Sequence, residues 1–246
     1  MVIGMKVKKI VIAIIVVIVS VFLLNKILII NKYKAKKNIT NAEIIFKDKI
    51  TVENTKKLTE NILTIDELSI NNYFKDYNEP DENSLMYFKK DKKGNVEGFY
   101  FISPMDSYIN IFENNKINIF ENLKNEDGFK KSVQKYFKKN NIVSDIDLLN
   151  YIKKNKYFKS TIFDSVNTIK IKYALNIFIN SILGDAKNII LIDGNVNGIL
   201  ADKGDVKLIY LIYNEQKIFQ ISLAGEEITN DSFINELLET VNFDLN

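Results

Sequence analysis

A long apolar run near the start of the chain limits how the rest can fold. Residues 10–24 read IVIAIIVVIVSVFLL, and Ser20 is the only polar residue among them. A helix needs roughly 20 mostly apolar residues to cross the hydrocarbon core of a bilayer. The run reaches that length by continuing past Asn25 and Lys26 into residues 27–30, because a lysine near a helix end can extend its ammonium group to the interface.

The nine residues before the run, MVIGMKVKK, are basic, and a basic start followed by an apolar core is also typical of a cleaved secretory signal peptide. No small-x-small cleavage pattern follows the run, whose exit reads FLLNKILIINKYK. The chain also has no cysteine for a lipid anchor. We therefore expect an uncleaved transmembrane anchor over residues 10–30, with a cleaved signal and a buried core helix as the alternatives.

The orientation of this anchor is not decided by charge, because lysines stand on both sides of the run. The N-terminal flank is short, and signal-anchors usually leave such a flank in the cytoplasm. We therefore expect a single-pass protein of the cell membrane whose C-terminal domain lies outside.

Lysine is concentrated beside the apolar run. Residues 1–37 contain eight lysines and no acid, whereas the net charge of the whole chain is +3, so the remainder carries −5. A basic segment next to a membrane suits contact with anionic headgroups. A mildly acidic domain lacks the basic face that nucleic-acid binding needs. We expect the lipid bilayer as a partner, and no nucleic acid.

Four residue types are absent from the chain: Cys, His, Trp and Arg. Without Cys there are no disulfides and no thiolate chemistry, and without His there is no Ser-His-Asp catalysis and no ordinary zinc site. The missing Arg removes bidentate clamps for phosphate or carboxylate. We expect no cofactor.

The first part of the domain, residues 45–160, is expected to be an α+β region. Its predicted elements are a helix within residues 49–72, a β-hairpin over 85–88 and 96–102, and amphipathic helices over 128–139 and 147–154. Ser144 and Asp147 have the spacing of a capping box for the last helix.

An internal repeat separates these elements, since residues 109–114 and 117–122 both read INIFEN. Apolar residues at helical spacing also occur here. We favour two strands joined at Asn114–Asn115, because Ile and Phe are good strand formers and Asn is a poor helix former.

The last part, residues 161–246, has the clearest pattern. A helix over 164–183, closed by Gly184, precedes four apolar strands and a final helix capped by Asn230 or Asp231. The strands are expected at residues 188–192, 199–201, 206–213 and 217–223. The predicted fold class is therefore α+β: an N-terminal transmembrane helix, then a mixed α/β domain that ends helix, four-stranded antiparallel sheet, helix.

The predicted organisation is a short cytoplasmic flank (1–9), a transmembrane anchor (10–30), a basic tether (31–44), an α+β region (45–160) and an α/β sandwich-like region (161–246). The element order over residues 164–243, with an Asp-Gly turn between two strands, resembles the C-terminal part of PsbP/Mog1-like α/β/α modules of membrane-anchored bacterial proteins. The resemblance implies a binding or assembly module.

One loop has the pattern of a metal site. Asp193, Asn195 and Asn197, followed by Gly198, match the opening of a calcium loop, in which alternating oxygen side chains wrap a hard cation. The twelfth position, which should hold a bidentate Glu, is Gly204. Asn and Gly are also what a tight strand connection requires, so we favour a structural turn and no metal.

Other residues have the spacing of catalytic groups. Ser132 and Lys135 match the S-x-x-K of serine acyl-enzymes, but no K-T-G motif accompanies them. The pairs Asp145–Asp147 and Glu226–Glu227 could act as two carboxylates, yet both fall where helix starts attract acids. The aromatic residues between Tyr87 and Phe101 could line a groove, although strand spacing favours a core. We expect no catalytic residues.

These patterns predict a non-enzymatic, membrane-tethered extracytoplasmic binding or assembly module. Its expected partner besides lipid is another envelope protein or a cell-wall component. The alternatives are a carboxylate-only hydrolase of the cell envelope and an immunity or inhibitor-type membrane protein.

Overall fold

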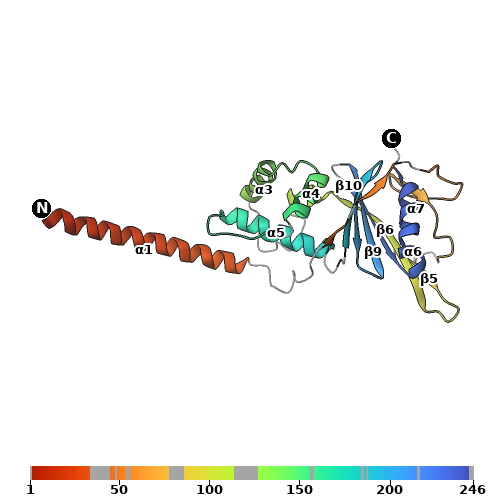
Figure 1. Cartoon of the computed structure of the whole chain (residues 1–246), viewed down its shortest axis with the longest axis horizontal. Helices are drawn as coiled ribbons and strands as arrows, with labels where there is room; N and C mark the ends of the chain where they lie inside the picture. Colours follow the sequence, from red (N-terminus) through yellow and green to blue (C-terminus); the bar gives the residue numbers. More distant parts are fainter. Residues whose placement is uncertain are drawn as a thin grey trace.

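The computed structural model describes residues 2–33, 45–47, 49–53, 56–77, 86–113, 127–155, 158–183, 186, 188–214 and 217–243. It is a mixed α+β protein with one long helix, α1 (Val2–Lys32), projecting from a body of sheet and helices (Figure 1). From Ile14 to Lys32, α1 is long and apolar enough to cross a membrane, and no residue of its most apolar stretch is buried. A signal sequence has the same length and composition.

The body is built on a sheet of eight strands. Its strands are β1 (Ile45–Phe46), β2 (Ile50–Val52), β5 (Met86–Lys90), β6 (Val96–Asp106), β7 (Asn188–Gly194), β8 (Asn197–Asp202), β9 (Val206–Asn214) and β10 (Lys217–Ala224). They lie in the order β1-β7-β8-β9-β10-β6-β5, and β2 also pairs with β7. The pairs from β7 to β5 are antiparallel, whereas β1 and β2 run parallel to β7.

Helices and a second, smaller sheet cover the two faces of the main sheet. The first face carries α2 (Tyr108–Glu113), α3 (Asp127–Lys139), α4 (Asp145–Asn155) and α5 (Val166–Leu183). The second face carries α7 (Asp231–Glu239), α6 (Glu226–Thr229) and the three-stranded sheet of β3 (Ile62–Ile65), β4 (Leu68–Asn71) and β11 (Asn242–Phe243). Figure 1 shows α3, α4 and α5 at the end of the body nearest α1.

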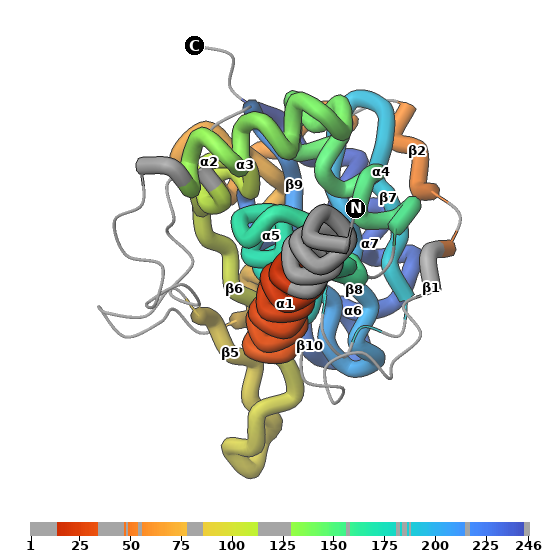
Figure 2. The backbone as a smooth tube through the Cα atoms, turned by 90° about the vertical axis from the view of Figure 1, so that its left-hand side faces the viewer, coloured from red at the N-terminus to blue at the C-terminus, as the bar shows by residue number. Residues whose placement is uncertain are grey.

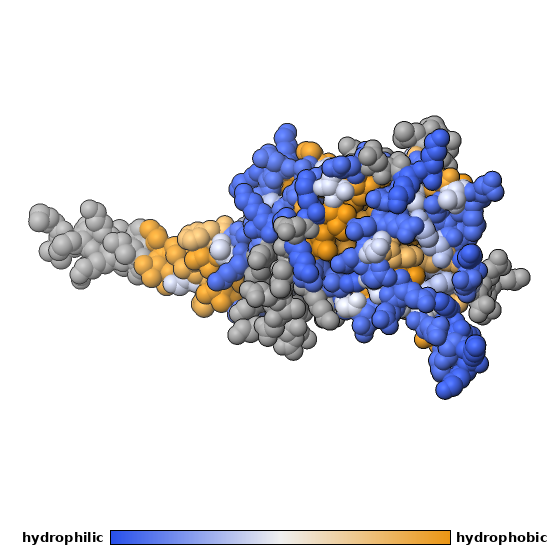
Figure 3. Space-filling model, turned by 45° about the vertical axis from the view of Figure 1, so that its right-hand side comes forward, coloured by the Kyte–Doolittle hydropathy of each residue, from blue (hydrophilic) through white to orange (hydrophobic). Residues whose placement is uncertain are grey.

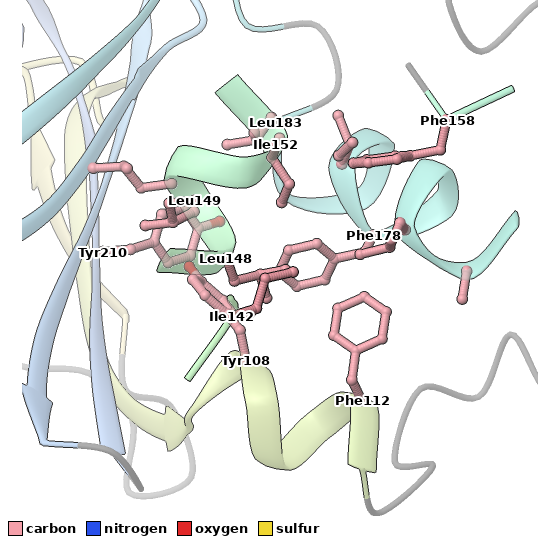
Figure 4. Packing of buried hydrophobic residues seen from close by; sticks show 14 of the residues in the cluster. Tyr108, Phe112, Ile142, Leu148, Leu149, Ile152, Phe158, Phe178, Leu183 and Tyr210 are labelled. Carbon is pink, nitrogen blue, oxygen red and sulfur yellow. The ribbon is translucent and has the colours of Figure 1, made fainter. Parts of the chain in front are cut away.

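Alternation along the strands creates two separate cores. In β9, Tyr210 points to the α2–α5 layer, whereas Ile209 and Leu211 point to the α7 layer, as expected for the period of two in a strand. In the first core, Tyr108 and Phe112 of α2 meet Phe178 of α5 edge-on, with ring centroids 4.9 Å apart in each pair (Figure 4).

Much of the predicted element order is confirmed. The β5–β6 hairpin, the helices α3, α4, α5 and α7, and the strands β7 to β10 all lie where the sequence predicts them. Asn230 caps α7, because its side-chain oxygen accepts a hydrogen bond from the N–H of Phe233 at 2.8 Å. Gly184 and the second INIFEN copy lie outside the described residues, as does most of the tether.

The prediction of a four-stranded sheet is wrong. β6 pairs with β10 along its length, and β1 and β2 pair with β7, so the four strands form the centre of a wider sheet. Both β7 and β10 would otherwise be edge strands with unpaired N–H and C=O groups. The boundary at residue 160 stays a prediction, although strands from both sides of it join this sheet.

The helix expected within residues 49–72 is also wrong. That segment forms β2, β3 and β4. Its apolar residues are placed by partners far away in the sequence: β2 pairs with β7, and β4 pairs with β11 at the C-terminus. Local spacing of apolar residues did not reveal these pairings.

The first INIFEN copy is helical, so the strand prediction there is wrong. α2 begins after Ser107, whose hydroxyl accepts a hydrogen bond from the N–H of Asn110 at 3.2 Å. Tyr108 and Phe112 are one helical turn apart and both are buried against α5. Burial of this helical pair outweighs the strand preference of Ile and Phe.

Candidate functional site

A polar pocket of about 580 Å³ opens between α3, the end of α4 and the start of α5. This volume lies within the range of pockets that hold small molecules or headgroups. Three lysines and one aspartate line it, so the pocket carries a net positive charge. We call it the α3–α5 pocket.

One face of α3 forms the first wall of the pocket. Ser132, Lys135, Tyr136 and Lys139 all line it, and their spacing of three and four residues places them on one side of a helix. The adjoining side of α3 carries Phe129, Val133 and Phe137, which are buried in the first core. The amphipathic pattern of α3 therefore presents two lysines to the pocket.

Two tyrosines close the floor between α3 and α4. The hydroxyl oxygens of Tyr136 and Tyr151 lie 2.9 Å apart in a hydrogen bond. Burial, reinforced by this bond, raises the pKa of Tyr136 far above its ordinary value. Tyr136 therefore stays neutral and adds no negative charge that would offset the lysines of the pocket.

Asp164 holds the loop before α5 in place. Its Oδ2 accepts hydrogen bonds from the N–H of Thr161 at 2.7 Å and from Lys172 Nζ at 2.9 Å. Lys172 also donates to the carbonyl of Lys159 at 3.1 Å, so it fastens both ends of the loop to α5. Next to it, Ser165 caps α5 by accepting from the N–H of Thr168 at 3.1 Å.

The fixed loop exposes two neighbouring apolar side chains, of which Phe163 lines the pocket. Phe163 is 91% exposed and Ile162 is 38% exposed. Exposed aromatic side chains of this kind normally find a partner surface or lie isolated on a flexible segment. Here the adjacent Asp164 is tied down by its hydrogen bonds, so the exposure of Phe163 is built into the turn.

The same loop meets the apolar helix. Lys26 Nζ of α1 donates to the carbonyl oxygen of Asp164 at 2.6 Å. Two helical turns after Lys26, Tyr33 contacts Tyr173 of α5 edge-on, with ring centroids 5.7 Å apart. The end of α1 is therefore joined to the wall of the pocket. Figure 2, which views the body from the α1 side, shows α5 next to the C-terminal end of α1, while Figure 1 shows the rest of α1 projecting away from the body.

The residues of the calcium-like loop are divided between different partners. Asp193 forms an ion pair with Lys49 at 2.8 Å, which lowers the pKa of the Asp193 carboxyl group. The side chain of Asn195 instead donates to the carbonyl of Glu53 at 2.8 Å, and Asn197 begins β8. Among the described residues, no three acidic side chains lie close enough to hold a metal ion.

The Ser-x-x-Lys pair of α3 lies at the α3–α5 pocket. Ser132 and Lys135 both line the α3–α5 pocket. Ser132 Oγ accepts a hydrogen bond from the side chain of Asn167 at 2.7 Å, which links α3 to α5. The sequence motif therefore marks the pocket, with Ser132 serving as a bridge between its two walls.

The two acidic pairs occupy helix starts. Asp147 Oδ2 accepts from the N–H of Ser144 at 3.0 Å, and Ser144 Oγ accepts from the N–H of Asp147 at 3.2 Å, which is the predicted capping box. Asp145 is buried and accepts from the N–H of Ile109 at 2.9 Å, so it joins α4 to α2. Glu227, in the first turn of α6, forms an ion pair with Lys89.

The aromatic residues of the hairpin belong to a packed cluster. Tyr100 is buried in the second core and stacks on Phe74 with ring centroids 3.7 Å apart. On its other side Tyr87 stacks at 4.5 Å with nearly parallel rings. This favours the interpretation of these aromatic residues as core rather than as a groove.

No family model, no curated protein and no solved structure matches this chain. The PsbP/Mog1-like resemblance therefore stays a prediction.

Sequence reasoning missed most of the α3–α5 pocket. Lys139 and Lys172 belong to elements that were predicted, but nothing in the sequence places α3 beside α5 at this point. The detectable signal was the loop between two helices in which the apolar pair Ile162 and Phe163 stands between polar residues.

Proposed function

We propose that this protein is a membrane-tethered binding module that works at the outer face of the cell membrane. The observation that carries the proposal is the pairing of α1 with a polar pocket through Lys26 and Asp164. An apolar helix alone is common to many proteins. A helix whose end is bonded to the wall of a pocket holds that pocket at a fixed distance from the bilayer.

The surface of the molecule supports separate roles for α1 and for the body. In Figure 3 the apolar side chains of α1 project from a body whose visible face is mostly hydrophilic around one apolar area. The two cores of the body are formed by its own elements, without α1. We therefore expect α1 to serve as the anchor and the body to carry the binding function.

We do not extend the proposal to hydrolysis or to an immunity role. A carboxylate-only hydrolase would need two close acids in a cleft. Two pockets of the described residues are each lined by two acids, Glu67 with Asp106 and Asp202 with Asp231. One acid of each pair is held by a lysine, since Glu67 pairs with Lys217 and Asp202 with Lys207. No contact among the described residues favours an inhibitor over a binding module.

Fractionation of cells that produce the full chain tests the anchor. We expect the protein to stay in the membrane pellet after alkaline carbonate extraction and to keep the mass of the uncleaved chain. Protease added to intact cells with a permeable wall should then digest the body. A soluble product that starts after residue 30, or a body protected until lysis, would contradict the anchor or its orientation respectively.

A further inference from the structure

The bond between α1 and the body fixes how deep the α3–α5 pocket lies. Lys26 is four residues before Ile30, which corresponds to about 6 Å along a helix axis. Lys26 Nζ donates to the carbonyl of Asp164, and a lysine near a helix end extends its ammonium group to the interface, so the loop before α5 lies beside the end of the apolar segment. If residues 10–30 span the bilayer, this loop lies at the level of the headgroups.

The side chains of the loop suit that position. Phe163 lines the pocket beside Asp164, and Phe163 and its neighbour Ile162 are both exposed. Segments that lie on a membrane surface bury Phe, Trp and Leu side chains at the boundary between headgroups and acyl chains. Exposure of the Phe163 ring to water is unfavourable because of the hydrophobic effect. The acyl boundary of a bilayer would cover this ring.

The charges behind the loop select an anion. Lys135 and Lys139 are exposed side chains on the pocket wall, and Lys172 is held at its base by Asp164. The start of α5 also faces the pocket through Ser165 and Thr168, and the N-terminal end of a helix carries partial positive charge. Ser132, Asn140 and Asn167 complete the polar lining. Asn167 Nδ2 donates to Ser132 Oγ and Asn140 Nδ2 to the carbonyl of Tyr136, and each amide has a second hydrogen that can donate to a phosphate oxygen.

The geometry points to the α3–α5 pocket as a binding site for the phosphate-bearing headgroup of an anionic phospholipid, with Phe163 and Ile162 inserted at the acyl boundary beside it. This inference rests on the proposed membrane anchor and names the ligand class of the same module. The lipid is held by lysines rather than by a bidentate clamp, because the chain has no Arg. Phosphate is the shared chemistry of a lipid headgroup and a free phosphate, and the depth of the loop favours the lipid.

The insertion of the loop is tested with a single tryptophan. The chain has no Trp, so Phe163→Trp introduces the only one, and full-length protein is reconstituted in bilayer nanodiscs containing phosphatidylglycerol. We expect blue-shifted emission and quenching by brominated acyl chains. The matched control is Val96→Trp, which is 54% exposed in the β5–β6 hairpin, at the end of the body remote from α1 (Figure 1). Equal emission and no quenching in both variants would refute insertion.

The charge requirement is tested on α3. The double variant Lys135→Gln and Lys139→Gln removes two pocket lysines, and Lys131→Gln with Lys138→Gln removes two exposed lysines of the same helix that do not line the pocket. Retention of phosphatidylglycerol by full-length protein in neutral detergent is measured by native mass spectrometry. At about one kcal/mol per lysine near an anionic lipid, we expect roughly 30-fold weaker retention in the pocket variant. We expect little change in the control.

Each remaining outcome has a separate meaning. An equal loss in both double variants would show general surface charge and overturn the pocket assignment. Inorganic phosphate that binds the detergent-solubilised protein as tightly as phosphatidylglycerol would show a site for a soluble phosphate and overturn the lipid. Failure of the anchor is distinguishable, because it appears as a cleaved chain in the mass of the cellular protein, while nanodisc samples contain the full chain.

Discussion

A buried asparagine on α5 provides a sharp test of how the helical layer is held together. Asn176 is 4% exposed in a helix whose buried residues are mostly apolar, Lys170 being the other buried polar one among those described. Its Oδ1 accepts from the N–H of Phe158 and its Nδ2 donates to the carbonyl of Phe158, both at 2.9 Å. One side chain thus satisfies both backbone groups of a buried residue in the α4–α5 connection.

The change Asn176→Ala removes both bonds and leaves both backbone groups of Phe158 in a buried site. Each lost bond costs about 1 kcal/mol net, and an unsatisfied buried group costs up to about 3 kcal/mol. Alanine is a better helix former than asparagine and recovers a few tenths of a kcal/mol. We therefore expect the free energy of unfolding to fall by about 2–4 kcal/mol.

The loss is measured by urea unfolding of the full chain in detergent, followed by far-UV circular dichroism, and by hydrogen exchange at the amide of Phe158. The control is Asn180→Ala, because within the described part of the chain the Asn180 side chain donates to the carbonyl of Asn176, a backbone group that lies inside the helix. We expect the control to lose less than about 1 kcal/mol. Equal, small losses in both variants with Phe158 still protected would refute the argument.

Three further predictions follow from single residues. Gly194→Ala should destabilise the protein by about 1–3 kcal/mol in thermal or urea unfolding. The reason is that φ is +116° there and a Cβ would lie 2.4 Å from the carbonyl oxygen of Val52. An unchanged midpoint would mean that β2 does not pack against Gly194. Ser144→Ala should cost about 1 kcal/mol in the same assay through loss of the α4 cap, and a neutral result would contradict the capping box. Burial raises the pKa of Tyr210 to about 12, so the folded state keeps a proton that the unfolded chain releases near pH 10, and stability should fall as the pH rises through this window. Tyr210→Phe should remove roughly 2–3 kcal/mol of that alkaline loss, as measured by urea unfolding at pH 9 and pH 12, and an unchanged pH dependence would contradict burial of the hydroxyl group.

The sequence was sufficient where structure depends on neighbours in the chain. The apolar run, the amphipathic faces of α3 and α7, the capping box at Ser144 and the β7–β10 strands all follow from spacing within a few residues. Each of these elements has its own periodicity, cap or turn, so the pattern of a few neighbouring residues predicts it. The Asp193 loop belongs to the same class, because Gly194 and Asn195 are what its tight strand connection requires.

The tertiary structure decided everything that depends on distant partners. β2 and β4 formed because β7 and β11 offer edges to pair with, and residues 108–113 became a helix because Tyr108 and Phe112 gain burial against Phe178. The α3–α5 pocket is of the same kind: its lysines are ordinary surface residues in the sequence. They converge only because α3 packs on α5 and because Lys26, 138 residues earlier than Asp164, joins the apolar helix to the same loop. Local periodicity determines which elements form, whereas burial and pairing between distant segments determine which side chains share a site, since those free energies exist only once the chain has folded.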